Sequence, residues 1–263
     1  MTRAPAATAV RDLASPHPAA GEPLPRRLLD AGAAAAALLL LAPSLLLIAV
    51  AIRLEDGGPV LFAQQRVGQG GGLFALYKFR KFRARGSLPA SPLTSTNDPR
   101  LSRLGRFLEA TKLDELPQFW NVLIGDMSLV GPRPETPHFG DCFHGSCREL
   151  LRYKPGIFGP SQAVFRREGA LHAAAADPEQ HYRAVLFPMK ARLDLAYCAQ
   201  RSVGRDIAWV GRCVLAILGL PFMRGQRSAL PDQVEGCLRL IASEADRGRR
   251  PAVPKPLRPA RES

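Results

Sequence analysis

Two adjacent carboxylates, Asp114 and Glu115, directly precede a short helical pattern, where they could meet a bound anion. The apolar residues of that pattern recur at the spacing i, i+3, i+4 and i+7: Leu116, Phe119, Trp120 and Leu123. Asp114 stands where an N-cap belongs, Pro117 falls in the first turn, and Gly125 is placed to end the helix. The positive end of a helix attracts anions, so a phosphate could bind here. A capped helix whose acids are merely solvated is the alternative.

Basic side chains on a predicted strand could neutralise an anion beside this pair. Apolar runs at 59–62 and 73–77, separated by glycines at 68–72, have the composition of two short strands around a turn. The second run continues into charged residues, and strand alternation places Lys78 and Arg80 on one face. The two side chains could form a positively charged surface beside Asp114 and Glu115. A solvated basic edge strand is the alternative.

An arginine held between prolines is the third cationic candidate. Arg133 lies in the run 131–134, where two prolines keep its backbone extended and position a guanidinium whose fork suits phosphate. A rigid turn with an incidental arginine is the alternative. Further along, residues 154–160 have the composition of a turn or loop, and Gln162 and Arg166 follow it.

Composition limits the classes of function. The net charge of +13, from 36 Lys+Arg against 23 Asp+Glu, suits nucleic acid, an anionic membrane surface or a phosphorylated substrate. Aromatic residues make up only 7% and no basic-aromatic platform repeats, so nucleic acid is the weaker option. Five scattered cysteines favour a reducing compartment over a disulfide framework. A zinc site at 138–147 is disfavoured, because its Cys-x4-Cys spacing lacks a second pair.

A continuous apolar run at 31–52 follows Arg26 and Arg27 and is closed by Arg53. As a helix these 22 residues would reach ~33 Å, enough to cross the hydrocarbon core of a bilayer. Pro43 in the middle removes a hydrogen bond and kinks a helix. The kink suits a helix that enters the bilayer and returns, and arginines at both ends suggest that neither end is translocated. The run alone leaves a kinked full span equally open.

The remaining elements are predicted more coarsely. Residues 84–95 have the composition of a flexible loop, and residues 1–23 and the Pro- and Arg-rich end from 247 are predicted to be disordered. The last predicted helix has an apolar body with basic residues beside it, so it could lie on a membrane surface or pack on the rest of the chain. Helices are predicted at about 100–110, 135–151, 178–199 and 204–222.

Together these stretches resemble the small monotopic phosphoglycosyl transferases of bacteria, the sugar transferase domain that starts lipid-linked glycan assembly. The resemblance covers roughly residues 24–220, and its specificity comes from the ordered set of motifs. The matching pieces are the kinked helix with Pro43 and the runs at 58–62, 65–68, 77–80, 97–100, 104–108, 113–118, 120–123, 125–134 and 155–157.

The resemblance implies a reaction and its partners. Such enzymes take a nucleoside diphosphate sugar, usually a UDP-sugar, and a membrane polyprenyl phosphate, and they release the nucleoside monophosphate and leave a polyprenyl diphosphate-sugar. The reaction starts exopolysaccharide, capsule, O-antigen or glycoprotein glycan assembly. Expected partners are therefore the nucleotide sugar, polyprenyl phosphate and membrane lipids, with downstream glycosyltransferases and a homodimer as further options, and no nucleic acid.

The resemblance also implies roles for residues. Asp114 corresponds to a nucleophile that forms a covalent phosphosugar intermediate in a ping-pong sequence requiring Mg²⁺, and it is an expected Mg²⁺ ligand. Glu115 corresponds to an assisting acid or base. The cations Lys78, Arg80 and Arg133 would neutralise the diphosphate in a site shielded from water. Gln162 and Arg166 stand where we expect substrate contacts.

Several positions differ from the usual family pattern. The family commonly has an arginine where this chain has Glu109 and a serine where it has Lys112, so a cation has moved by three positions. Phe158 and Phe165 also replace the usual residues near the expected substrate contacts. These differences motivate an alternative function, that of a catalytically impaired membrane-bound homologue acting as an interaction protein. A basic nucleic-acid binder is a third hypothesis, motivated by charge alone.

The expected fold is α+β and mainly helical. A kinked re-entrant membrane helix packs on a small cytoplasmic catalytic domain with short strands and amphipathic interfacial helices, at the bacterial plasma membrane. With the resemblance included, re-entry is favoured over a full span. The predicted organisation is a leader at 1–23, the membrane helix at 24–53, the catalytic domain at 54–224 and a tail at 225–263.

Overall fold

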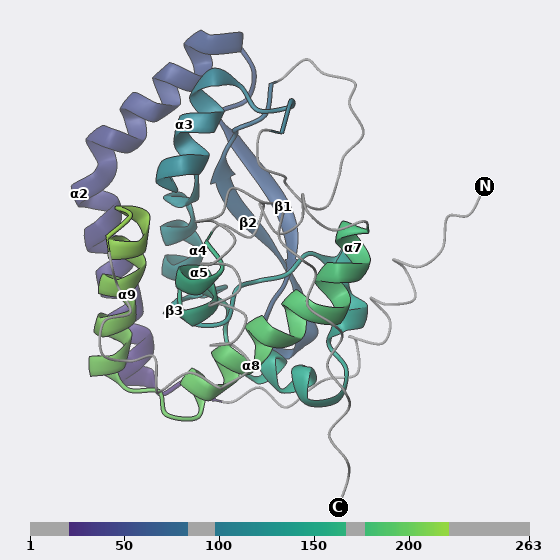
Figure 1. Ribbon diagram of the computed structural model, residues 1–263. Helices are drawn as coiled ribbons and strands as arrows, with labels where there is room; N and C mark the ends of the chain where they lie inside the picture. Colours follow the sequence, from purple (N-terminus) through teal and green to yellow (C-terminus); the bar gives the residue numbers. More distant parts are fainter. Residues whose placement is uncertain (1–20, 84–97, 167–176, 221–263) are drawn as a thin grey trace, which may run out of the picture.

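The computed structural model describes residues 21–83, 98–166 and 177–220. The predicted leader up to residue 20, the loop at 84–95 and the tail from 225 lie outside these residues. In the described part, one long apolar helix stands along one side of a smaller body of helices and short strands (Figure 1). The predicted mainly helical α+β fold with a long N-terminal apolar helix is therefore confirmed.

The long helix, α2 (Leu24–Asp56), runs without interruption through Pro43 and ends where Gly57 turns left-handed, with φ of 70°. Its most apolar window has a mean hydropathy of 2.7 and is only 6% buried, and it is long and apolar enough to cross a membrane. Ala34, Ala37, Leu38 and Leu41 pack it against a short helix of the body, α4 (Gln118–Ile124). Further along α2, Ile48, Ala49 and Ile52 pack against Phe79 and Leu108. Much of the other apolar surface of α2, including Leu39 and Leu47, is exposed.

An antiparallel hairpin joins β1 (Leu61–Val67) and β2 (Leu73–Phe79) through a glycine turn, as predicted for 68–72. The predicted bounds of the first strand, 59–62, are wrong, because the strand begins at Leu61 and continues through the polar residues up to Val67. Strand β2 ends at Phe79, so Arg80 lies beyond its end.

The acidic pair lies in a turn between two helices. Helix α3 (Arg103–Thr111) starts later than predicted, after Ser102 caps it by accepting a hydrogen bond from the N–H of Gly105 at 2.8 Å. Lys112 then takes a left-handed conformation (φ 61°) and a 3₁₀ turn follows, η2 (Leu113–Glu115). The predicted N-cap role of Asp114 is wrong, because the left-handed residue breaks the helix early and α4 starts only after Pro117. Gly125 ends α4 as predicted (φ 100°).

Two short strands pair in parallel across the body, β3 (Ser128–Val130) and β4 (Gly156–Phe158). The interpretation of 154–160 as a turn or loop is therefore wrong for its middle. The α-helix predicted at 135–151 is also wrong: the chain forms two 3₁₀ segments, η3 (Pro137–Cys142) and η4 (Gly145–Arg152), separated by a left-handed Gly145 with φ of 53°.

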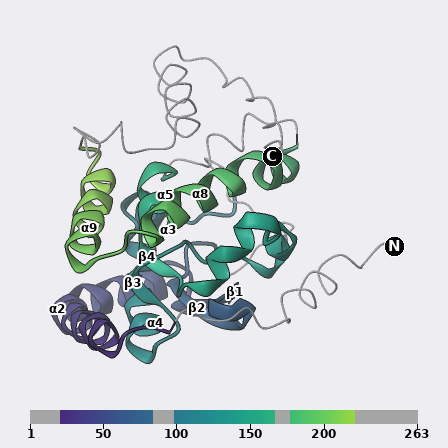
Figure 2. The ribbon, with the colours of Figure 1, turned by 90° about the horizontal axis from the view of Figure 1, so that it is seen from below.

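The C-terminal part of the described chain is helical, as predicted. Helix α9 (Val203–Ile217) stands beside α2 in two perpendicular views (Figures 1 and 2). Phe139, Tyr182 and Phe187 form an aromatic cluster within the buried core of this part. The elements are α5 (Pro160–Val164), α7 (Pro178–His181), a π-helical turn η5 (Tyr182–Leu186), α8 (Phe187–Cys198) and α9 (Val203–Ile217).

Candidate active site

The acidic pair is the point where three distant segments meet. Glu115 accepts a hydrogen bond from the Nζ atom of Lys78 on β2, at 2.9 Å, and one from Nη2 of Arg133, at 3.2 Å. Both carboxylates are buried, with 2% of Asp114 and 9% of Glu115 exposed. The structure therefore brings together four of the predicted site residues, Lys78, Asp114, Glu115 and Arg133.

Asp114 differs from its neighbour in having an unsatisfied oxygen. Its Oδ1 atom is buried and has no hydrogen-bond partner among the residues that the structure describes. Burial, together with the neighbouring charge of Glu115, raises the pKa of Asp114. A buried polar atom without a partner is rare in native proteins, so this oxygen is a candidate for contact with a ligand.

The surrounding cations determine the charge of Glu115. Burial alone would raise its pKa, but Lys78, Arg133 and Lys112 outweigh burial and hold the pKa well below its usual range. Burial also lowers the pKa of Lys78 to about 8, although the charge of Glu115 opposes that shift. Glu115 is thus an ionised anchor for two cations, and Asp114 is left as the carboxylate with the less compensated charge.

The position of Arg133 depends on close packing of β3 against β4. A Cβ atom added at Gly156 would lie 2.1 Å from the backbone N of Gly131, so the two strands approach more closely than any side chain allows. Gly131 immediately precedes the proline-bracketed arginine. The parallel pair therefore fixes the loop that carries Arg133.

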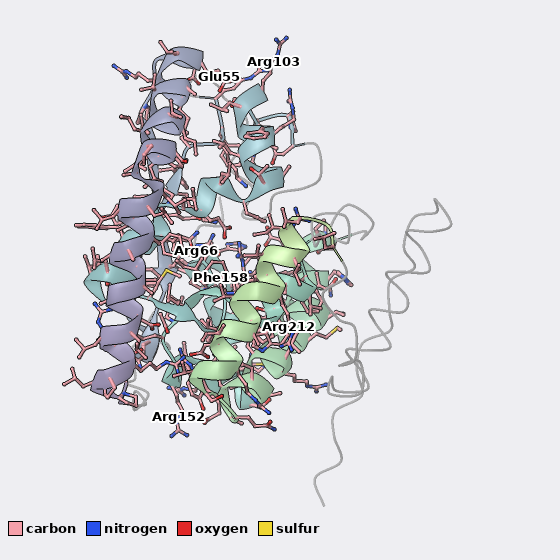
Figure 3. The ribbon with its side chains drawn as sticks, turned by 90° about the vertical axis from the view of Figure 1, so that its left-hand side faces the viewer. Glu55, Arg66, Arg103, Arg152, Phe158 and Arg212 are labelled. Carbon is pink, nitrogen blue, oxygen red and sulfur yellow. The ribbon has the colours of Figure 1, made fainter. Side chains whose placement is uncertain are left out.

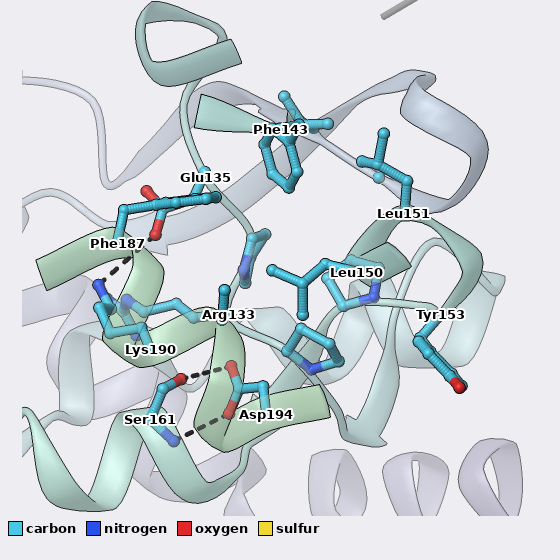
Figure 4. A pocket seen from close by; sticks show the side chains of 16 residues that line it. Arg133, Glu135, Phe143, Leu150, Leu151, Tyr153, Ser161, Phe187, Lys190 and Asp194 are labelled. Carbon is cyan, nitrogen blue, oxygen red and sulfur yellow. Dashed lines mark hydrogen bonds and ion pairs between the residues drawn. The ribbon is translucent and has the colours of Figure 1, made fainter. Parts of the chain in front are cut away.

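A buried polar network lies beneath Arg133 (Figure 4). Asp194 of α8 accepts hydrogen bonds from the N–H of Ser161 at 3.0 Å and from its hydroxyl at 2.7 Å, at the start of α5. Beside it, Nζ of Lys190 lies 3.5 Å from Glu135 and 3.1 Å from the hydroxyl of Tyr182. The network ties α8 to both segments that carry predicted substrate contacts.

Burial raises the pKa of Asp194 to about 6, although the hydrogen bonds from Ser161 oppose the shift. None of this network was predicted from the sequence. A usable signal was present, because Lys190 and Asp194 stand four residues apart in a segment whose other members are largely apolar. Charged residues embedded in an apolar helix are almost never fully buried unless they are paired.

A cavity of about 360 Å³ opens beside the acidic pair and lies between α2 and α9. Glu115, Arg133, Gln162 and Arg166 line it, so Gln162 and Arg166 are also brought to the site. Gln162 donates to the backbone oxygen of Gly156 at 3.0 Å, and Arg166 donates to that of Ala110 at 2.8 Å. The cavity thus connects most of the predicted site residues.

Arg80 is not among the residues that meet at the pair. Its guanidinium forms an ion pair with Asp56 at the end of α2 and donates to the backbone oxygen of Pro59 at 2.6 Å. The predicted alternation of Lys78 and Arg80 fails because β2 ends between them. Pro43 lies within α2, two residues after Leu41, which lines the cavity.

The residues present fit the Mg²⁺ ion that the resemblance implies. Magnesium is usually bound through one or two carboxylates, with water and substrate phosphates completing its octahedron. The orphaned Oδ1 atom of Asp114 offers one such ligand. No group of three or more His, Cys, Asp or Glu side chains that could hold a metal occurs in the described ranges. A site that depends on substrate phosphates is consistent with both observations.

Comparison with known proteins gives a consistent result. The family model described as bacterial sugar transferase matches residues 22–219. A UDP-glucose:undecaprenyl-phosphate glucose-1-phosphate transferase of Caulobacter vibrioides is 38% identical over 208 residues, which cover 75% of this chain and 74% of that protein. A UDP-N-acetylgalactosamine-undecaprenyl-phosphate N-acetylgalactosaminephosphotransferase of Aeromonas hydrophila is 37% identical over 199 residues, which cover 73% of this chain but only 43% of that longer protein.

Proposed function

The chain belongs to the bacterial sugar transferase family, whose relatives are phosphoglycosyl transferases, and we propose that it transfers a sugar phosphate from a UDP-sugar to a polyprenyl phosphate. The products would be a polyprenyl diphosphate-sugar and UMP, and the reaction would start assembly of a lipid-linked glycan. The observation that carries this proposal is the buried, unpartnered Oδ1 of Asp114 beside a carboxylate that already holds two cations.

Asp114 acts as the nucleophile in this proposal. Its carboxylate oxygen forms a bond to the sugar-bearing phosphorus of the donor, the bond from that phosphorus to the oxygen of UMP breaks, and UMP leaves with the electron pair. An oxygen of the polyprenyl phosphate then attacks the same phosphorus and releases the carboxylate. The two steps let a soluble donor and a lipid acceptor use one nucleophile in turn.

The other residues stabilise charge and position. Lys78 and Arg133 would face the negative charge that gathers on the transferred phosphoryl group, in a site that burial protects from water. For Glu115 we propose that holding these cations is the main role, rather than the acid or base role expected from the resemblance, because its pKa lies well below the usual range. Asp114 would also bind Mg²⁺, which when present would neutralise charge on the diphosphate.

Replacement of the nucleophile tests the proposal. Asp114→Asn should reduce UMP release from every UDP-sugar by roughly a thousandfold or more, because an amide cannot form the intermediate. Asp141→Asn, at an exposed carboxylate outside the site, should retain activity. The measurement is UMP release across a panel of UDP-sugars, with thermal unfolding to confirm that both variants fold. Full activity of Asp114→Asn would refute the mechanism.

The same panel of UDP-sugars tests the alternative of a catalytically impaired homologue. Wild-type protein that releases no UMP from any donor would support this alternative. The structure weakens one reason for that alternative. Glu109, which replaces the usual arginine, forms an ion pair with Nζ of Lys81 at 2.5 Å. The added negative charge is therefore compensated locally.

A further inference from the structure

The cavity beside the acidic pair has two chemically different ends. Its polar end contains Glu115, Arg133 and Lys112. Gln162, Arg166 and Lys190 also line it, but most of its lining is apolar. The apolar part includes Leu41 of α2 and Val214 and Ile217 of α9. Figure 3 looks onto these two helices, with Phe158, another lining residue, between them. A ligand that fills this cavity needs an anionic head and an apolar chain.

The apolar walls continue onto the outer surface of the protein. On α9, Val214 both lines the cavity and is 44% exposed, and Leu218 beyond it is 64% exposed. Helix α2 is the membrane candidate of the chain. An apolar chain could therefore pass from the membrane into the cavity without crossing a polar surface.

Lys112 is the cation at the polar end that remains available to a ligand. Its backbone is used, since its N–H bonds to the oxygen of Glu109 at 3.3 Å and its oxygen accepts from Glu115 at 3.2 Å. Its ammonium group makes no ion pair with any described residue. By contrast, the ammonium groups of Lys78 and Lys81 are held by Glu115 and Glu109.

The backbone at Lys112 supports a specific placement of that side chain. Lys112 is the sole non-glycine residue with positive φ in the described ranges. A left-handed lysine is unfavourable, and such conformations persist where the surrounding structure holds them, often at functional sites. Here the conformation ends α3 and carries the side chain to the cavity.

We propose that this cavity is the acceptor site: the first part of the prenyl chain lies between Leu41, Val214 and Ile217, and Lys112 binds the phosphate. The inference rests on the proposed function, which supplies a lipid phosphate as the second substrate. The volume of about 360 Å³ falls within the range of small-molecule sites. Lys78 reaches Glu115 from β2 and does not line the cavity, which leaves that side for the donor.

Direct binding of the lipid tests the two halves of the site separately. The full chain in detergent is titrated with undecaprenyl phosphate, with the uncharged alcohol undecaprenol and with inorganic phosphate. Lys112→Asn is the test variant, because asparagine tolerates the left-handed conformation. It should lower the affinity for undecaprenyl phosphate about tenfold, as expected for loss of one charge-assisted hydrogen bond, and leave the affinity for undecaprenol unchanged. Inorganic phosphate alone should bind far more weakly than the lipid.

Filling the apolar end should affect both lipids. Ile217→Trp should lower the affinities for undecaprenyl phosphate and undecaprenol alike by about tenfold or more, because the larger ring occupies the space of the prenyl chain. Val214→Phe should act in the same direction if the first variant folds poorly. Ile207→Trp is the matched control on α9, since Ile207 is 69% exposed and does not line the cavity. Lipid affinity of Ile217→Trp and Val214→Phe equal to that of the control overturns the inference.

The donor half-reaction separates this inference from the proposed function. UMP release by the wild-type protein in a single turnover without acceptor is therefore measured beside the lipid titrations. If the wild-type protein releases UMP but all the variants bind the lipids with wild-type affinity, the proposed acceptor site is wrong and the proposed function stands. If lipid binding responds as expected but no donor yields UMP, the function fails and the lipid site stands.

Discussion

Two neighbouring carboxylates acquire different properties from what surrounds them. Glu115 is bound by Lys78 and Arg133, and these cations hold its pKa low despite burial. Asp114, one residue earlier, keeps an oxygen without a partner, and burial raises its pKa. The 3₁₀ turn produces this division, because successive residues point in different directions. The division suits a nucleophile beside an electrostatic anchor.

The charge of Lys78 predicts an alkaline limit to activity. Burial lowers its pKa to about 8, so the side chain is cationic below that pH and becomes neutral as the pH rises through it. UMP release should therefore fall as the pH rises through about 8. Lys78→Arg, which stays charged, should move this limb to higher pH even if the rate is lower. An unchanged pH profile in Lys78→Arg would show that another group sets the limit.

The left-handed Lys112 predicts a gain of stability on replacement. Lys112→Gly should raise the free energy of unfolding by about 1 kcal/mol, because glycine adopts positive φ without a Cβ penalty. Lys112→Ala is the matched control: it removes the same charge but keeps Cβ, and should not gain. Thermal or urea unfolding of both variants measures the difference. Equal stability of the two would mean that the charge, not the backbone, governs this position.

At the scale of elements, periodic segments were predictable and context-dependent ones were not. The apolar helix, the hairpin and the C-terminal helices carry long or regular patterns, and the structure confirms them. Strand β4 has three residues and pairs in parallel with a distant segment, so no local pattern marks it. The turn at the acidic pair was missed because nothing in the type of Lys112 indicates a left-handed backbone.

The site shows the same limit. The structure brings the predicted site residues Lys78, Asp114, Glu115 and Arg133 together. Arg80 instead pairs with Asp56, because β2 ends one residue earlier. Strand alternation applies only while the strand lasts. The buried polar network beneath Arg133 could not be predicted from local sequence patterns, because it joins residues from separate segments of the chain.

The close approach of β3 and β4 predicts that adding one methyl group at Gly156 lowers both stability and activity. Gly156→Ala would place Cβ 2.1 Å from a backbone nitrogen of Gly131, and neither backbone can move aside freely. We expect a loss of about 1–3 kcal/mol in the free energy of unfolding. The turnover should fall by roughly 100-fold, because Arg133 would be displaced from Glu115.

Gly211→Ala provides the control for that prediction. Gly211 lies inside α9, and a Cβ there meets nothing within 4 Å. Removing a flexible glycine from a helix interior should stabilise the protein by about 0.5–1 kcal/mol. Thermal unfolding and UMP release are measured for both variants. A Gly156→Ala protein as stable and active as wild type would contradict the argument that this contact positions the arginine.

At the scale of the whole molecule, both ends of α2 are fastened to the same body. Near its start, Arg27 donates to the oxygens of Val122 and Leu123, each at 2.6 Å, and the Ser128 hydroxyl donates to Asp30 at 2.5 Å. Near its end, Glu55 accepts from the N–H of Leu104 at 3.1 Å. Charged residues such as Arg152 and Arg103 lie near opposite ends of the body (Figure 3). A full crossing would draw this charged body into the bilayer.

We therefore predict that α2 enters the membrane and returns, with both ends on the cytoplasmic face. Leu24→Cys and Leu54→Cys place thiols at positions that are 70% and 81% exposed. A membrane-impermeant maleimide should label neither thiol in spheroplasts and both in inverted vesicles, since an impermeant reagent reaches only its own side. The unmodified chain gives the background from its five native cysteines. Labelling of position 24 alone in spheroplasts would establish a full span, because a crossing helix must expose its two ends to opposite compartments.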